Sequence, residues 1–360
     1  MSEGVQRYLS REGARIYRWP IDLFPDLSGF AHLVMVDDIR ALVDVGSGFG
    51  DSNVQLEQGL NEIRQSYAEP ADWGDLTHIL ITHGHIDHFG GLPFVLERCH
   101  AAVGVHELDL RVLTNYEERL TIVARRLHEF LDESGLTAEE RNRLMALYLL
   151  NKHLFASVHV DFTYSSVGME LGRLRMTHVP GHCPGHVVIQ VDDILLSGDH
   201  VLARISPHQA PERLSLYTGL GHYLESLDRL RQLAPEVSLT LGGHYAPIED
   251  LVGRIGAIEE VHRQRLNAVL DLLQTPRTIG EVAHSLFPSA SGYHELLALE
   301  EAGSHVEYLA QRGYLGVDNY RELERDGPVA LRYVRLGGAS PSLPRLIPRP
   351  WEANGASGVP

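Results

Sequence analysis

Short apolar runs recur along the first 244 residues, and most of them stop at a polar side chain. Residues 76–81 are apolar and β-branched enough to predict a buried strand, and residues 187–191, 194–198 and 239–242 have the same character. Residues 174–179 predict a further extended segment. Reactive groups are usually presented where a strand gives way to a loop, so the ends of these runs are the first places to search for chemistry.

Between these runs lies a block, from about residue 106 to 155, whose apolar positions repeat at helical spacing. Residues 120–131 place Leu, Val and Ile among Glu and Arg, which predicts an amphipathic helix. Residues 144–150 are apolar around most of the helical circumference, so we expect them to be covered. The block is either a lid that shapes the apolar portion of a substrate pocket, or a helix layer packed on the sheet or on a second subunit.

After residue 265 the pattern predicts three short helices, over 278–287, 291–302 and 303–312, and then a hairpin of 314–317 and 329–334. This order resembles a winged-helix domain. Residues 337–360 are rich in Pro, Gly, Ala and Ser, with Trp351 as the large anchor, which predicts a mobile or surface-bound tail.

The densest group of metal-ligating side chains is the segment Thr82-His83-Gly84-His85-Ile86-Asp87-His88, directly after the run at 76–81. Neutral imidazole and ionised carboxylate suit zinc and its borderline neighbours. Residues two apart in an extended chain point the same way, so His83 and His85 could share one metal. Asp87 and His88 would then face a second. Two ions about 3.5 to 4 Å apart need a bridging ligand and further donors from distant parts of the chain.

Three such donors follow later in the sequence. His182 lies in the segment 179–186, where prolines and glycines fix a tight loop and can hold a ligand rigidly. Asp199 ends the apolar run at 194–198, and its two carboxylate oxygens are able to bridge two cations. His244 follows the run at 239–242.

This ordered set resembles the metallo-β-lactamase superfamily, in which a His-x-His-x-Asp-His cluster is followed by separate His, Asp and His ligands. The resemblance covers roughly residues 15 to 265. It implies an α/β fold, a four-layer αββα sandwich with a helical insertion and, here, a C-terminal winged-helix domain. It also implies the ligand set: one metal on His83, His85 and His182, a second on Asp87, His88 and His244, Asp199 bridging them, and Asp44 supporting the ligand loop.

Several residues indicate which branch of the superfamily the sequence resembles. Asp199 stands where the best-known zinc β-lactamases carry a cysteine, which argues against antibiotic hydrolysis. His85 in place of glutamate argues against the flavin-linked diiron branch, and we expect a glyoxalase II-like or β-lactamase-like hydrolase. Cys183 replaces a common threonine and is expected to be turned away from the metals. His186 is expected to support the site, and it could contact the backbone of a ligand.

Charge and composition indicate which classes of binding partner are expected for this chain. The net charge of −17 repels phosphate backbones, and residues 278–325 alone carry −5, so we expect no nucleic acid and read the C-terminal region as a packing or homodimerisation element. No apolar run approaches the length of a membrane span, and the polar start lacks a signal-peptide core, which predicts no membrane association. With only Cys99 and Cys183 available, a reduced, cytoplasmic setting is expected.

The residues and the resemblance together predict a dinuclear metal-dependent hydrolase. Its expected substrate is a small-molecule ester, thioester or lactone, attacked by a metal-bridging hydroxide, with zinc as the default ion and iron or manganese permitted. Asp87 is expected to orient the nucleophile or accept its proton. His222 and Tyr223 are candidates for touching the substrate, although Tyr223 begins a segment with the spacing of a packing helix.

Two other functions stay open: a phosphodiesterase or ribonuclease of the same fold, and a non-enzymatic winged-helix regulator. The predicted organisation is a catalytic domain over 1–265 with its insertion at about 106–157, a winged-helix-like domain over 266–336, and a tail over 337–360.

Overall fold

The N-terminal residues build a seven-stranded mixed sheet in the computed structural model, which describes residues 4–150, 152, 155–324 and 327–337. Its strands run in sequence order: β1 (Gln6–Leu9), β2 (Arg15–Phe24), β3 (Leu27–Val36), β4 (Ile39–Val43), β5 (His78–Leu80), β6 (Ala102–Val105) and β7 (Phe162–Thr163). The first four strands pair antiparallel and β4 to β7 pair parallel. The parallel half therefore sends the carboxyl ends of β4, β5 and β6 to one edge, where a site can be assembled.

A second sheet has five strands in the order β12 (Leu239–Gly242), β11 (Ile194–Gly198), β10 (Val187–Val191), β9 (Leu174–His178) and β8 (Glu170–Leu171). Every residue of β10 and β11 is buried, because each strand is covered on both faces. On β10, Val187 and Ile189 pack between the sheets while Val188 packs with the helices, as the two-residue period of a strand requires. The predicted strands at 187–191, 194–198 and 239–242 are confirmed.

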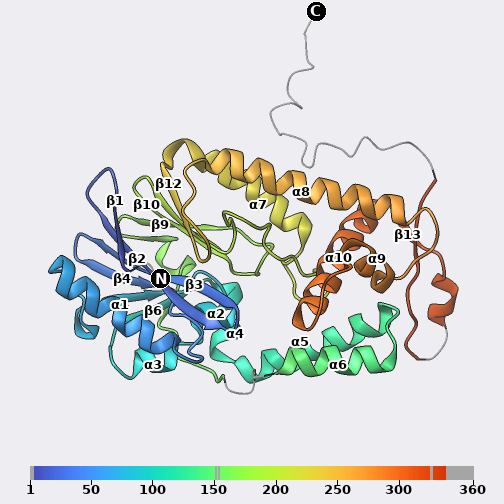
Figure 1. Cartoon of the computed structure of the whole chain (residues 1–360), viewed down its shortest axis with the longest axis horizontal. Coiled ribbons are helices and arrows are strands. Elements are labelled where there is room, and N and C mark those ends of the chain that lie inside the picture. The colour runs from blue at the N-terminus through green and yellow to red at the C-terminus, as the bar shows by residue number, and fades with distance from the viewer. Residues whose placement is uncertain (1–3, 151, 153–154, 325–326, 338–360) are drawn as a thin grey trace, which may run out of the picture.

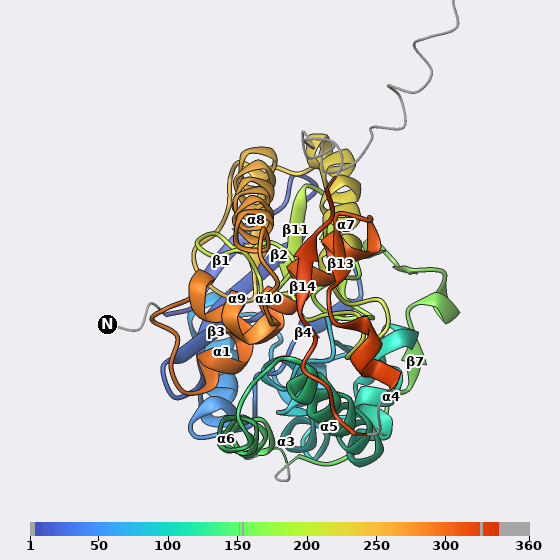
Figure 2. The ribbon, with the colours of Figure 1, turned by 90° about the vertical axis from the view of Figure 1, so that its right-hand side faces the viewer.

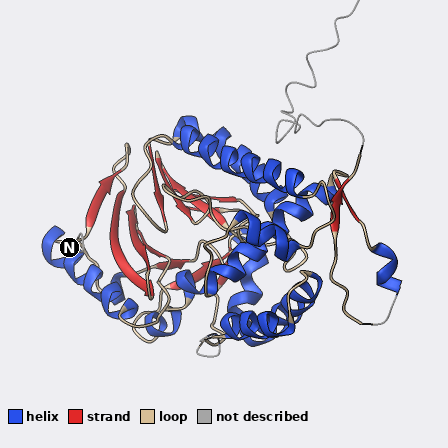
Figure 3. Ribbon diagram, turned by 45° about the vertical axis from the view of Figure 1, so that its right-hand side comes forward, coloured by secondary structure: helices blue, strands red, loops and turns tan. Residues whose placement is uncertain are grey.

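The sheets face each other and helices cover their outer faces (Figures 1 and 3). Helices α1 (Ser52–Tyr67) and α3 (Leu92–Leu96) pack on the first sheet through Leu56, Leu60 and Val95. Helices α7 (Leu220–Leu233) and α8 (Leu251–Leu272) pack on the second through Leu227 and Ile255. The α/β fold predicted from the sequence is confirmed, with the layers in the order helix, sheet, sheet, helix.

The remaining short elements connect these layers. They are α2 (Ile86–Phe89) and the 3₁₀ turns η1 (Trp73–Asp75), η3 (Ser165–Val167), η4 (Ala234–Glu236) and η5 (Tyr320–Glu324).

The block predicted to be helical forms α4 (Glu107–Thr114), α5 (Tyr116–Glu133) and α6 (Ala138–Leu149). It packs against the C-terminal helices, because Leu127 and Phe130 of α5 and Leu144 of α6 belong to the same core as α10. The expectation that residues 144–150 are covered is wrong for this chain by itself: Leu149 is 41% exposed and Leu150 is 62% exposed.

The C-terminal region contains α9 (Ile279–Leu286), α10 (Tyr293–Gln311) and an antiparallel hairpin of β13 (Leu315–Val317) and β14 (Tyr333–Arg335). The predicted break between helices 291–302 and 303–312 is wrong, since α10 is continuous. The reason is packing: a Cβ added to Gly303 would lie 2.8 Å from the Phe130 ring, so this glycine permits a close approach of α5 and does not end the helix.

Helix α8 runs across the predicted domain boundary at 265/266, and α9 and α10 share one core with the second sheet. The division into domains and the winged-helix interpretation stay predictions. Nearly all of the predicted tail, from residue 338 onward, lies outside the described residues. None of the described helices is long and apolar enough to span a bilayer.

Candidate metal centre

The ligand loop that follows β5 is held by Asp44, which comes directly after β4. Its carboxylate accepts hydrogen bonds from the backbone N–H of Thr82 (2.8 Å), from the Thr82 hydroxyl (2.8 Å) and from Nδ1 of His88 (2.7 Å). Asp44 is buried and has a φ of 58°, a left-handed conformation that Asp tolerates better than most residues. The predicted supporting residue is therefore in direct contact with the loop.

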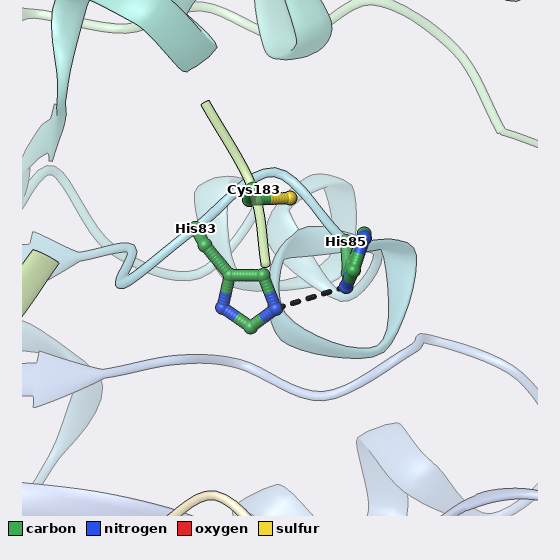
Figure 4. A group of neighbouring side chains, drawn as sticks. All are labelled: His83, His85 and Cys183. Atoms are coloured by element: carbon green, nitrogen blue, oxygen red, sulfur yellow. Dashed lines mark hydrogen bonds between the residues drawn. The ribbon is translucent and has the colours of Figure 1, made fainter. Parts of the chain in front are cut away.

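The first group of candidate ligands contains His83, His85 and His182. Nε2 of His83 lies 3.1 Å from Nδ1 of His85, and the ring of His182 is 4.6 Å from that of His85 and 5.2 Å from that of His83. The expectation that Cys183 turns away from this group is wrong, because its Sγ lies within 4.8 Å of ligand atoms of His83 and His85 (Figure 4). Burial raises the pKa of the Cys183 thiol well above its usual value, which keeps it protonated.

The second group contains Asp87, His88 and His244, with Asp199 between the two groups. Oδ2 of Asp199 lies 3.3 Å from Nε2 of His244, 3.5 Å from Nε2 of His88 and 4.0 Å from Nε2 of His182. Oδ2 of Asp87 lies 3.6 Å from Nε2 of His244. All seven residues predicted as ligands thus converge on one place at the edge of the two sheets.

Three of the imidazoles are oriented by an acceptor on their far side. Nδ1 of His182 donates to the carbonyl of His208 (2.9 Å), and Nδ1 of His244 donates to the carbonyl of Ser28 (2.7 Å). Nδ1 of His88 is bound by Asp44, as described above. In the neutral form of each ring Nδ1 carries the proton, so the lone pair of Nε2 would then face the cluster, as a metal ligand requires.

Burial and charge set the protonation of the site. Burial lowers the pKa of His83 well below its usual value and that of His85 to about 3, so both rings are neutral. Burial alone would lower the pKa of His88, but Asp44, Asp199 and Asp87 raise it well above its usual range. Burial would likewise raise the pKa of Asp87, but His88 and His244 lower it to about 2. Despite burial, the pKa of Asp199 is likewise lowered well below its usual value by His244 and His88, so Asp87 and Asp199 are ionised and attract positive charge.

The donor set fits divalent cations. Nε2 of His88, Nε2 of His182 and Oδ1 of Asp199 are buried and make no hydrogen bond of normal geometry with the described residues. Buried polar atoms rarely stay without a partner, and the two histidine nitrogens lie 3.5 Å and 4.0 Å from Oδ2 of Asp199, inside the cluster. Two donors about 2.1 Å from one tetrahedral ion lie about 3.4 Å apart, which is close to the spacings given above. Imidazole nitrogens with carboxylate oxygens are the ligands that zinc-like ions prefer.

Two supporting residues connect the ligand segments. His186, which stacks on His83 with ring centroids 4.5 Å apart, accepts a hydrogen bond at Nε2 from the backbone N–H of Asp199 (3.1 Å). The expected contact of His186 with a ligand backbone is confirmed. Asp109 of α4, which the sequence did not single out, accepts from the N–H of Gly84 (2.8 Å) and from that of Gly185 (3.0 Å). It therefore ties the loop of His83 and His85 to the loop of His182.

Asp109→Asn is expected to weaken metal binding about 10-fold or more, because an amide offers one oxygen where the carboxylate accepts two N–H groups. Burial raises the pKa of Asp109 to about 6, so at pH 7.5 the wild-type side chain is ionised and can accept both. Metal affinity measured by chelator competition at pH 7.5 checks this. Glu107→Gln on the same helix is the matched control; an equal loss in both variants would contradict the assigned role.

The two residues predicted to touch the substrate differ in burial and in their hydrogen-bond partners. Tyr223 is fully buried and its hydroxyl donates to the carbonyl of His200 (2.9 Å), which favours the packing interpretation. His222 is half-buried, with Nε2 at 3.0 Å from an oxygen of Glu212. Contact of either residue with a substrate stays a prediction.

Comparison with known proteins agrees with this geometry. Residues 25–244 match the family model of the metallo-beta-lactamase superfamily, and the chain belongs to that superfamily. A metallo-beta-lactamase fold-containing protein of Sulfurisphaera tokodaii is 28% identical over 203 residues, which cover 54% of this chain and 70% of that protein. The probable metallo-hydrolase YflN of Bacillus subtilis is 27% identical over 202 residues, which cover 52% of this chain and 70% of that protein.

Among solved structures, a metallo-beta-lactamase family protein from Thermus thermophilus matches with a TM-score of 0.66 and 27% identity, covering 89% of this chain and 98% of that one. A beta-lactamase domain protein from Burkholderia ambifaria shows the same fold, with a TM-score of 0.65 at 21% identity over 92% of this chain and 94% of that one. Members of the superfamily are metal-dependent hydrolases, and the His and Asp clusters described here are what divalent metal binding requires.

Proposed function

We propose that the protein is a dinuclear metal-dependent hydrolase of small-molecule esters, thioesters or lactones. The observation that carries the proposal is the place of Asp199, whose Oδ2 is 3.3 Å from His244 on one side and 4.0 Å from His182 on the other. A carboxylate shared between two groups of three ligands is the arrangement that a pair of neighbouring ions needs. Zinc is the ion we expect, with iron or manganese also compatible with a site of this kind.

The ligands differ in exposure, which indicates the side from which a substrate arrives. The side chain of Asp87 is 16% exposed, whereas those of His88, His182 and His244 are 3%, 6% and 6% exposed. His85 is also only half-buried. Asp87 and His85 therefore border the open side of the cluster. Bound cations would supply activated water and would polarise the carbonyl oxygen of the substrate.

We assign to Asp87 the role of accepting the proton of the attacking water. It is ionised, since its pKa is lowered to about 2, and it lies on the open side within reach of a molecule entering there. His88 and His244 hold it from behind, because Nε2 of each lies 3.8 Å or less from its Oδ2. The bond from the acyl carbon to the leaving sulfur or oxygen would then break, and the proton taken up by Asp87 would pass to the leaving thiolate or alkoxide.

Charge supports a small-molecule substrate over a polyanion. The chain carries a net charge of −17, which repels nucleic acids and gives no attraction to anionic membranes. The proposal includes a cytoplasmic location and the glyoxalase II-like or β-lactamase-like branch of the superfamily, as the sequence predicts. In it, the region 266–336 is a winged-helix-like packing or homodimerisation element, and the uncovered Leu149 and Leu150 of the helical insertion are further candidates for a subunit contact.

Metal removal tests the function directly. The purified protein should hold two divalent ions per chain and hydrolyse members of a panel of thioesters, lactones and aryl esters. A chelator should abolish this activity, and zinc should restore it, because the ions are needed for the nucleophile. Phosphodiesters and RNA belong in the same panel, and faster cleavage of either than of every acyl compound would overturn the proposal. Acyl hydrolysis that survives complete removal of metal would overturn it as well.

A further inference from the structure

The segment between β11 and α7, residues 199–219, separates the candidate metal centre from helix α10. The segment begins with the candidate ligand Asp199. Further along, the carbonyl of His208 accepts the Nδ1 hydrogen of the candidate ligand His182 at 2.9 Å. Its other side lies along α10, which sits between α8 and the helical insertion (Figure 2). The position of this segment therefore determines the orientation of one candidate ligand.

The side chain of His208 is held by two neighbouring carboxylates of α10. Its Nε2 lies 2.8 Å from Oε2 of Glu300, and its Nδ1 lies 3.6 Å from Oε2 of Glu301. The backbone N–H of Gln209 donates to the same oxygen of Glu301 at 2.8 Å. The residue whose carbonyl orients His182 is thus fixed through its side chain and through the next peptide group.

The same face of α10 holds the segment at two further places. Oε2 of Glu307 accepts from the N–H of Glu212 at 2.7 Å, and the Ser304 hydroxyl accepts from the N–H of Leu220 at 3.1 Å. These residues follow Glu300 at intervals of four and seven, which places them on one side of a helix. One helical face therefore carries the acceptors for Gln209, for Glu212 and for Leu220 at the start of α7.

Glu301 is itself fixed by groups behind it. Its side chain is 6% exposed, and its Oε1 accepts from Nη1 of Arg265 on α8 at 2.8 Å. His305 donates from Nδ1 to the carbonyl of Glu301 at 2.7 Å, and Nδ1 of His262 lies 3.2 Å from Nε2 of His305. His262, Glu301 and His305 lie close enough together to suggest a metal site, but these bonds already engage their facing atoms. The group forms a hydrogen-bonded support.

We propose that α10 is a positioning element of the metal centre. Glu300 and Glu301 are positioning residues that hold His208, and through its carbonyl they direct Nε2 of His182 toward the ion shared with His83 and His85. This inference rests on the proposed function, because it requires that site to bind metal. It assigns the C-terminal helices a role in the chemistry of the chain even though none of their residues belongs to the ligand set.

The test compares three single variants of the full-length protein: Glu301→Gln, Glu300→Gln and, as the matched control, Glu295→Gln. Glu295 lies on the same helix but pairs with Arg143 of α6 at the surface, away from the metal centre. For each protein, competition with a chromogenic chelator measures the affinity of the zinc ions one by one. The visible spectrum of the cobalt-substituted protein reports the geometry at each ion.

We expect one of the two ions to bind about 10- to 100-fold more weakly in Glu301→Gln and Glu300→Gln, because groups that orient a ligand typically affect affinity on this scale. The second ion and the control variant should keep wild-type affinity. The cobalt spectrum should change in the two variants and not in the control. Adding His208→Ala to Glu300→Gln should cause little further loss, since both changes break the same connection.

Other outcomes separate the possible failures. If wild-type protein binds two ions and both variants bind them with unchanged affinity, the positioning role is overturned and the proposed function stands. A lower unfolding temperature with unchanged affinities would show a purely structural role and would overturn it too. If the wild-type protein binds no metal, the proposed function is overturned, and the positioning role that rests on it is overturned as well. Should Glu301→Gln not fold, Glu300→Gln carries the test, since Glu300 is nearer the surface, with its side chain 12% exposed.

Discussion

Asp199→Ala should abolish turnover and lower the metal content of the purified protein while the fold persists. We expect kcat/KM to fall by at least about 10³-fold, because this carboxylate is the one group shared by both sets of ligands. The fold should survive because the bond to Nε2 of His186 comes from the backbone N–H of Asp199, which alanine retains. Elemental analysis after gel filtration, acyl-substrate kinetics and circular dichroism would measure these three effects.

Asp38→Ala is the matched control for Asp199→Ala. Asp38 lies exposed in the turn between β3 and β4, so its removal changes the same charge without touching the cluster. The control should keep wild-type metal content and activity. Wild-type turnover in Asp199→Ala would mean that the bridging role is assigned to the wrong residue.

Among the proposed variants, Asp44→Ala should cause the largest loss in the free energy of unfolding. The change leaves Nδ1 of His88 and two donors of Thr82 without an acceptor in a buried place, and removing one partner of a buried charged pair costs roughly 3 to 5 kcal/mol. It also places alanine at a φ of 58°, which adds about 1 to 2 kcal/mol of backbone strain. Urea denaturation of the metal-free protein measures the loss in the free energy of unfolding.

Asp44→Asn separates the two causes, because asparagine tolerates a left-handed backbone but offers one acceptor oxygen. We expect it to unfold at an intermediate urea concentration and to bind metal about 10-fold more weakly than the wild-type protein. If both variants were as stable as the wild-type protein, the hydrogen bonds of Asp44 would be of no consequence for the loop.

Much of the fold and of the candidate site could be predicted because the candidate ligands lie in the segments that follow strands. His83, Asp199 and His244 follow short apolar runs that are readable in the sequence, and parallel strand ends meet at one edge. The helical insertion is equally readable from its repeat of apolar positions. These signals are local, so one sequence is sufficient for them.

The features that escaped prediction depend on contacts between distant segments. Asp109 is one carboxylate among many on an ordinary helix, and only the approach of Gly84 and Gly185 distinguishes it. The acceptor for His182 is a backbone carbonyl, which every residue has. Gly303 suggests a break in the sequence because a helix end and a close helix crossing both favour glycine. Residues 208–212 carry no sequence pattern that would reveal their bonds to α10.

The candidate ligands come from both sheets of the sandwich. His83, His85, Asp87 and His88 follow β5 of the first sheet, while His182 lies in the loop after β9 and Asp199 and His244 follow β11 and β12 of the second. An ion bound among them would therefore connect one sheet to the other, at the edge of the apolar layer that separates them. Since a ligand held only by the native state adds its binding free energy to folding, metal supply and resistance of this protein to proteolysis are thermodynamically linked.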